Sequence, residues 1–119
     1  MKPLIKLFLE DHGKYIFGPG RARILRAVDN LGSLNKAARK QGMSYRWAWG
    51  RIRETEQSFG VTLLIADKES GKGNTKALTP EARELLEWFT SLESEMQNLA
   101  EEAWTKMPSW LRPKAETGS

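Results

Sequence analysis

Apolar residues recur at helical spacing in three consecutive segments of the first half of the chain. In residues 19–31 they lie three or four positions apart, and Pro19 suits the first turn of a helix. Residues 33–59 repeat the pattern twice, with a break at Gly42 between the two runs. The pattern predicts a bundle of three helices, of which the last two form a helix-turn-helix.

Capping residues mark where these last two helices begin and end. Ser33 and Ser44 can each accept a hydrogen bond from a backbone amide in the first turn of the helix that follows. Gly42 and Gly60 can adopt the left-handed conformation that closes a helix. If the apolar residues face inward, the second helix turns basic and aromatic side chains outward, as a DNA recognition helix does.

Short apolar runs on either side of the helices predict two small β-hairpins. Residues 3–17 contain two runs around a turn at residues 11–13, and residues 61–79 contain two around a Gly-rich loop. The second hairpin directly follows the helix-turn-helix, which is the place and pattern of a wing. Its Gly-Lys-Gly at residues 71–73 lacks the G-x-x-x-x-G-K-[ST] spacing of a phosphate-binding loop.

Residues 80–107 predict one long helix with an apolar seam. Thr79 can cap its first turn, and Pro80 suits that turn. The apolar positions are 4, 3, 4, 3 and 4 residues apart, as in a two-stranded coiled coil. A helix of about 25 residues, roughly 38 Å long, extends beyond so small a core, so we expect a homodimer. The seam consists of Leu85, Phe89, Leu92, Met96, Leu99 and Ala103.

The predicted fold class is therefore mainly α with small β-hairpins. A winged helix-turn-helix domain in residues 1–79 precedes a dimerisation helix in residues 80–107. Residues 108–119 contain helix breakers and no periodicity, so we expect a flexible tail there.

Charge is unevenly distributed along the chain. Residues 1–60 contain 12 Lys and Arg against 5 Asp and Glu, residues 61–79 contain 3 against 2, and residues 80–119 contain 4 against 8. The three segments carry +7, +1 and −4, which sum to the net charge of +4. A basic front favours docking of a polyanion such as double-stranded DNA, although a solvated charged surface is the simpler alternative.

The composition argues against several other classes of protein. With no cysteine and one histidine, His12, the sequence predicts no metal site, no cofactor and no catalytic nucleophile with a supporting base, hence no enzyme. No apolar run approaches the roughly 18 residues of a membrane span, and the N-terminus lacks the features of a signal peptide. We expect a cytoplasmic protein with no membrane partner.

The second helix of the helix-turn-helix supplies the candidate base contacts. Ser44 and Tyr45 at its N-terminus suit hydrogen bonds to phosphates or base edges, and Arg46 suits a bidentate contact to guanine. Trp47 suits either contact with thymine or packing against the preceding helix.

Further along the same helix, Trp49 and Ile52 are assigned to the core. Phosphate contacts are expected from cations on both helices and on the wing. The full set of candidate DNA-binding residues is Ser33, Lys36, Arg39, Ser44, Tyr45, Arg46, Trp47, Arg51, Arg53, Lys72 and Lys76.

Four short motifs carry a resemblance to a known family. They are GSLNKAA at 32–38, GMSYRWAW at 42–49, SGKG at 70–73 and LTP at 78–80. With these motifs the chain resembles, over about residues 3–105, the N-terminal winged-helix domain of ModE-type molybdate-responsive transcription regulators. That domain shares a general plan with LysR-type DNA-binding domains.

The resemblance implies a domain that dimerises through its helices and binds an inverted-repeat operator in double-stranded DNA. ModE-type regulators commonly carry a C-terminal molybdate-binding module of small β-barrel domains. The resemblance covers the winged helix without that module, which is expected either of a stand-alone family member or of a piece of a longer regulator, and no residue here is assigned to molybdate. The alternative is a protein interaction module that uses the same scaffold and seam to pair with a separate sensor or regulator.

Overall fold

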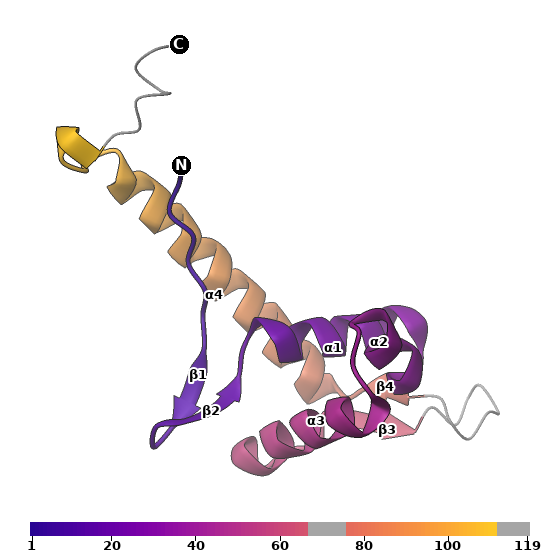
Figure 1. Ribbon diagram of the computed structural model, residues 1–119. Coiled ribbons are helices and arrows are strands. Elements are labelled where there is room, and N and C mark those ends of the chain that lie inside the picture. The colour runs from indigo at the N-terminus through magenta and orange to yellow at the C-terminus, as the bar shows by residue number, and fades with distance from the viewer. Residues whose placement is uncertain (67–75, 112–119) are drawn as a thin grey trace.

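The computed structural model describes residues 1–66 and 76–111, and it is mainly helical with two small hairpins. Figure 1 shows a compact head from which one long helix projects, and the molecule measures 60 × 33 × 22 Å. The elements in chain order are β1 (Leu9–Asp11), β2 (Lys14–Phe17), α1 (Pro19–Leu31), α2 (Leu34–Lys40), α3 (Tyr45–Phe59), β3 (Leu64–Ala66), β4 (Lys76–Leu78), α4 (Pro80–Trp104) and the 3-10 turn η2 (Ser109–Leu111).

The helix-turn-helix has the predicted helices and caps. The side-chain oxygens of Ser33 and Ser44 each accept a 3.1 Å hydrogen bond from the amide three residues on, at the start of α2 and α3. Gly42 and Gly60 have φ angles of +71° and +70°, the left-handed conformation that ends a helix. Local sequence chemistry therefore fixes the bounds of both helices.

The core lies where α1, α2 and α3 meet the first turns of α4. Phe17, at the end of β2, is fully buried and contacts Phe89 of α4 edge to face, with ring centroids 5.0 Å apart. Small side chains let the helices approach closely. The fully buried residues of the bundle include Ala22, Leu25, Val28, Leu34, Ala37, Ala38, Ala48 and Ile52.

The N-terminal hairpin is shorter than the predicted 3–17, because β1 begins at Leu9. The preceding residues instead lie along α4 (Figure 1). There the Ile5 amide donates to Oε1 of Gln97 at 3.0 Å, and Nε2 of Gln97 donates to the Pro3 carbonyl at 2.9 Å. One glutamine of α4 thus satisfies backbone groups that a longer hairpin would have paired.

The long helix begins as predicted and ends slightly earlier. Thr79 accepts a 3.1 Å hydrogen bond from the Ala82 amide, and Pro80 occupies the first turn. The helix stops at Trp104 rather than at residue 107. Residues 109–111, predicted to belong to a flexible tail, form η2, while residues 112–119 lie outside the described part of the chain.

One residue of the predicted seam is placed elsewhere. Phe89 is fully buried inside its own chain, so it has no surface to offer a partner. Trp88, one position earlier, is 51% exposed. The prediction for Phe89 was therefore wrong. The reason is that α4 carries two overlapping apolar faces, one for the core and one for solvent, and the sequence alone does not separate them.

Candidate nucleic-acid interface

The outer side of α3 presents what we call the recognition face, formed by Arg46, Gly50 and Arg53. Ala48 and Ile52 are fully buried on the opposite side of the helix and hold it against the bundle. Arg46 and Arg53 are exposed. Because burial on one side fixes the rotation of the helix, the recognition face points to solvent.

Positive charge surrounds this face. The sequence from Asn30 to Arg53 contains six Lys and Arg and no Asp or Glu. On α2, Lys36 and Arg39 are both exposed. A surface of one sign raises the local concentration of a polyanion and accelerates its association.

Two tryptophans flank the recognition face, each beside a cation. Trp47 is 56% exposed, and the guanidinium carbon of Arg51 lies 4.1 Å from its ring centroid. Trp49 was predicted in the core, but it lies at the surface, 5.5 Å from the guanidinium carbon of Arg53 and 5.8 Å from Nζ of Lys76. These distances permit cation–π contact, which holds the rings and the long cationic side chains together.

The wing is anchored beside the helix-turn-helix. Strands β3 and β4 pair antiparallel, as the sequence predicted, and Leu64 lies opposite Leu78, a register that was not predicted. The Lys76 amide donates a 3.0 Å hydrogen bond to the carbonyl of Gly32, between α1 and α2. The base of the wing thus has a fixed position relative to α2, whereas Lys72 and the SGKG motif lie outside the described residues.

A buried carboxylate joins the end of α3 to the wing. Oε2 of Glu56 accepts hydrogen bonds from the amides of Leu63 at 2.7 Å and Leu64 at 3.3 Å. Its Oε1 lies 3.4 Å from Nη1 of Arg53. The sequence prediction missed this link, because a glutamate on a charged helix usually faces solvent and its backbone partners are seven and eight residues away.

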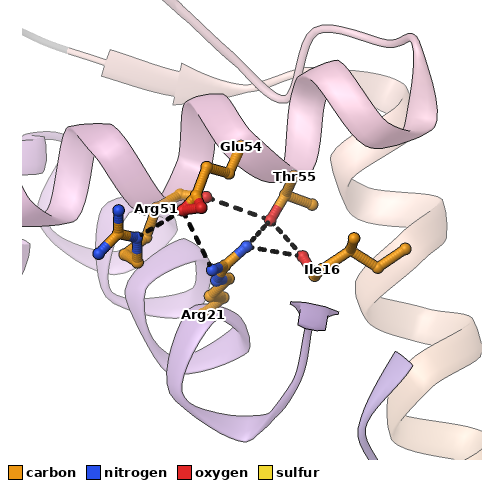
Figure 2. Close-up of polar contacts among 5 residues, drawn as sticks. All are labelled: Ile16, Arg21, Arg51, Glu54 and Thr55. Atoms are coloured by element: carbon orange, nitrogen blue, oxygen red, sulfur yellow. Dashed lines mark hydrogen bonds and ion pairs between the residues drawn. The ribbon is translucent and has the colours of Figure 1, made fainter. Parts of the chain in front are cut away.

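A second polar cluster holds α3 to α1 and β2 (Figure 2). Nη1 of Arg21 donates to the Ile16 carbonyl at 2.9 Å and to the Thr55 hydroxyl at 3.0 Å. Nη2 of the same side chain lies 3.6 Å from Oε1 of Glu54, and Nε of Arg51 lies 2.9 Å from that oxygen. Arg21 does not stand out in the sequence, since an arginine in an amphipathic helix normally marks the solvent side.

Burial and charge set the electrostatics of this cluster. Burial lowers the pKa of Arg21, and the nearby carboxylate of Glu54 opposes that effect. The guanidinium carbon of Arg21 also lies 4.6 Å from the ring centroid of Tyr15. Burial raises the pKa of the Tyr15 phenol, partly offset by Arg21. The guanidinium of Arg21 remains charged despite its burial. The cluster therefore contains a buried cation that is held by fixed partners.

The candidate DNA-binding residues within the described chain lie on α2 and α3, at the N-caps of these helices and at the start of β4. Ser33 and Ser44 already accept helix-capping hydrogen bonds, but a hydroxyl that accepts can still donate to a phosphate. Arg51 contacts both Trp47 and Glu54, and Arg53 makes the same kinds of contact, at longer distances, with Trp49 and Glu56. These candidates are Ser33, Lys36, Arg39, Ser44, Tyr45, Arg46, Trp47, Arg51, Arg53 and Lys76.

Residues 1–66 and 76–111 contain no group of three or more His, Asp or Glu side chains placed to hold a metal ion. None of their helices combines the length and the apolar character needed to cross a membrane.

Comparison with known proteins bears directly on this face. Residues 20–83, more than half of the chain, match the model of the bacterial regulatory helix-turn-helix proteins of the lysR family. The chain belongs to the lysR family of helix-turn-helix proteins. The matched region runs from the start of α1 to the first turn of α4, so it contains the whole recognition face. This lysR-type domain is a DNA-binding domain of transcription regulators and not an enzyme.

Similar proteins extend the resemblance to the ModE group. The chain is 32% identical over 75 residues to the transcriptional regulator ModE of Haemophilus influenzae, a match that covers 63% of this chain and 29% of ModE. It is 31% identical over 93 residues to the molybdenum-pterin-binding protein MopA of Rhodobacter capsulatus, covering 77% and 35%. The lysR-type domain thus corresponds to about a third of the length of these relatives.

A solved structure is also similar. ArgP from Mycobacterium tuberculosis matches with a TM-score of 0.49 and 25% identity, covering 75% of this chain and 30% of that one.

Proposed function

We propose that this lysR-type domain binds specific sequences in double-stranded DNA as a homodimeric, ModE-like transcription regulator. In this proposal α3 enters the major groove, and the wing lies on the backbone or in the minor groove. The observation that carries the proposal is the recognition face: an exposed, cationic helix surface in a family of DNA-binding regulators.

Arg46 lies in the first turn of α3, where a recognition helix contacts base edges. Its planar guanidinium matches the two acceptors of guanine in the major groove. For the other cations we propose contacts with phosphates rather than with bases. Each such contact makes the fall of log affinity with log salt concentration steeper by about 0.9. These proposed phosphate contacts are Lys36, Arg39, Arg51, Arg53, Lys72 and Lys76.

Gly50 supports a close approach of α3 to DNA. A glycine inside a helix destabilises it by roughly 1 kcal/mol relative to alanine. The chain's own packing does not require this glycine, because a Cβ added at Gly50 meets no atom within 4 Å. It lies between Arg46 and Arg53 on the recognition face. We infer that the missing side chain lets the helix backbone lie close to a base pair or phosphate.

This inference predicts effects of opposite sign for the Gly50→Ala variant. The free energy of unfolding should rise by about 0.5–1 kcal/mol, while specific DNA binding should weaken by tenfold or more. Thermal denaturation and a DNA titration measure the two quantities. Gly20→Ala is the matched control, because Gly20 also lies in a helix but away from this face, and its DNA affinity should stay unchanged. Unchanged affinity in Gly50→Ala would exclude the close approach.

The proposed function as a whole is tested by selecting bound sequences from a randomised duplex pool. We expect the wild type to enrich an inverted repeat with half-sites about one helical turn apart. Arg46→Ala should lose about 1–3 kcal/mol on that site and relax the preference at one base pair per half-site. Lys14→Ala, which removes an equal charge from the start of β2, should keep the selected sequence.

Other outcomes of the selection would change the proposal. Retained selectivity in Arg46→Ala would reject the guanine contact while leaving DNA binding intact. Weak binding by the wild type, without any enriched sequence and lost as salt rises, would reject sequence-specific recognition and favour the protein interaction module.

The homodimer part of the proposal relies on the exposed part of α4. Met96 is 39% exposed and Leu99 is 57% exposed. Both belong to the second half of α4, the helix that projects from the head (Figure 1). Together with Leu92 and Ala103 they form an apolar stripe of the kind that pairs in coiled coils. Leu85 adjoins this stripe and also packs on the core.

The names of three of the relatives concern molybdenum. The matches cover only 29–35% of the relatives' lengths. We assign no residue of this chain to molybdate. The proposal concerns the DNA-binding module and its pairing.

A further inference from the structure

Trp47 is a large apolar side chain that the fold leaves in solvent. The sequence leaves two roles open for it, contact with thymine or packing against α2. Packing against α2 would bury the side chain, but Trp47 is 56% exposed in the first turn of α3. A tryptophan that its own chain does not bury, in the part of the chain that matches the helix-turn-helix family, is typical of a binding surface.

Arg51 holds the indole ring in place. Its guanidinium carbon lies over the ring, 4.1 Å from the centroid, the shortest such distance in the part of the chain that the structure describes. Residues 47 and 51 are one helical turn apart, so their side chains are neighbours on the surface of α3. A planar guanidinium over an aromatic face stabilises one orientation of the ring and leaves the rest of the ring to solvent.

Arg51 is itself held, through Glu54, by the buried cation Arg21. Oε1 of Glu54 lies 2.9 Å from Nε of Arg51 and 3.6 Å from Nη2 of Arg21, and Figure 2 shows this carboxylate between the two guanidinium groups. Arg21 is only 5% exposed and is fixed by its own hydrogen bonds. The orientation of the Trp47 ring therefore depends on groups in the core. Such support reduces the entropy that an exposed side chain loses on binding.

The major groove of DNA presents one group that matches an apolar ring. Among the four bases only thymine carries a methyl group at carbon 5, and this group projects into the major groove. The other base edges there present hydrogen-bond donors and acceptors. Phosphates pair better with cations, several of which surround the ring. An indole has a single donor and a large apolar surface, so the thymine methyl group is its best partner in this groove.

We propose that Trp47 recognises thymine through its 5-methyl group, at a base pair close to the guanine assigned to Arg46. This inference rests on the proposed function and adds a second specificity-determining residue with the base that it selects. Trp47 and Arg46 are consecutive in the first turn of α3, where a recognition helix contacts base edges. Arg51 is a positioning residue that holds the ring, and it keeps its proposed contact with a phosphate.

The size of the expected effect follows from the surface that one methyl group buries. Burying a methyl group against an apolar surface strengthens binding by about fourfold. A homodimer on an inverted repeat makes the same contact in each half-site. Removal of the methyl group from both half-sites should therefore weaken binding by about 15-fold, because well-separated contacts add in free energy.

Exchange of thymine for uracil tests the contact, because uracil lacks only the methyl group and pairs in the same way. In the site selected from the duplex pool, each symmetry-related pair of thymines is replaced in turn by uracil. The measured quantity is the dissociation constant of the uracil duplex divided by that of the thymine duplex. For the wild type we expect a ratio of about 15 at one pair of thymines. For Trp47→Ala the ratio at that pair should fall to about one.

Three further variants separate recognition of the base from support of the helix. Trp47→Phe keeps an aromatic ring and should retain part of the ratio. Arg51→Lys keeps the charge but loses the planar guanidinium, so the ratio should fall while the dependence of affinity on salt stays that of the wild type. Trp88→Ala removes a tryptophan of similar exposure from α4, and it should keep the wild-type ratio. Thermal denaturation checks that each variant is folded.

The outcomes separate this inference from the proposed function. A wild-type ratio of about one at every thymine, a selected site without thymine, or an unchanged ratio in Trp47→Ala would overturn recognition of thymine by Trp47. Each of these results leaves the sequence-specific regulator standing. An unchanged ratio in Arg51→Lys would overturn the positioning role of Arg51. If the wild type enriches no sequence at all, specific recognition of DNA and the thymine contact are both wrong.

Discussion

Replacing Phe89 by alanine should lower the free energy of unfolding by about 3–5 kcal/mol, because it empties a fully buried ring site. Phe89 packs edge to face on Phe17, so the change removes both apolar burial and an aromatic contact. Domains of this size have total stabilities of about 5–15 kcal/mol, so the variant should lie near the limit of folding. Urea denaturation at a concentration where the monomer dominates measures the effect.

Leu99→Ala is the matched control on the same helix. Leu99 is more than half exposed, so its replacement should change monomer stability by less than about 0.5 kcal/mol and should weaken dimerisation instead. The reverse result, with Phe89→Ala stable but monomeric, would mean that Phe89 faces the partner as the seven-residue pattern suggested.

Removing the carboxylate of Glu56 is expected to have the second largest effect. Glu56→Ala leaves the amides of Leu63 and Leu64 buried without their acceptor and takes the partner from Arg53. An unsatisfied buried group destabilises by about 1–3 kcal/mol, so the total loss should be about 2–4 kcal/mol. Because these amides lead into β3, the wing should also lose its fixed orientation, and DNA affinity should fall at protein concentrations where the chain remains folded.

Chemical denaturation and a DNA titration of the same preparations measure both effects. Glu56→Gln keeps one oxygen acceptor and should lose less stability than Glu56→Ala. The adjacent Gln57→Ala changes an exposed side chain and should be neutral. If Glu56→Ala had the same free energy of unfolding as Gln57→Ala, the hydrogen bonds of Glu56 between α3 and the wing would not contribute to the stability of the fold.

Sequence patterns predicted the parts of this fold that local chemistry decides. The caps at Ser33, Ser44 and Thr79 each bind an amide within their own first turn, so no distant residue is needed to recognise them. The wing strands and the three helices of the head followed from short-range periodicity and turn residues in the same way.

The parts that were missed depend on distant contacts. Trp49 has the spacing of a core residue, but it lies at the surface beside Lys76, which comes from the wing. Arg21 is buried because Ile16 and Thr55 supply acceptors from two other elements. Residues before Leu9 look like a strand, but their backbone is bound by a side chain more than ninety positions later. Periodicity carries no information about such partners.

For the candidate interface, the sequence predicted helix α3 and which of its sides is exposed. It did not predict the side-chain contacts that hold the exposed cations in place. The exposed residues of α3 could be inferred once the buried side was known, since helix geometry fixes the rest. The contacts of Arg51 with Trp47 and of Arg53 with Glu56 constrain two cations that the sequence treated as independent phosphate contacts.

The division of α4 between the head and solvent has a consequence for dynamics. Its first turns are ordered by the core through Ala82 and Phe89, and Arg83 adds an ion pair of 3.0 Å to Asp29 of α1. Its last turns have exposed apolar residues and mainly lateral support from the N-terminal segment. Helical order there depends on packing more than on intrinsic propensity. In the proposed homodimer, the first half of this helix would fold with the monomer, and the second half would be stabilised by the partner chain, so that the two halves would belong to different cooperative units.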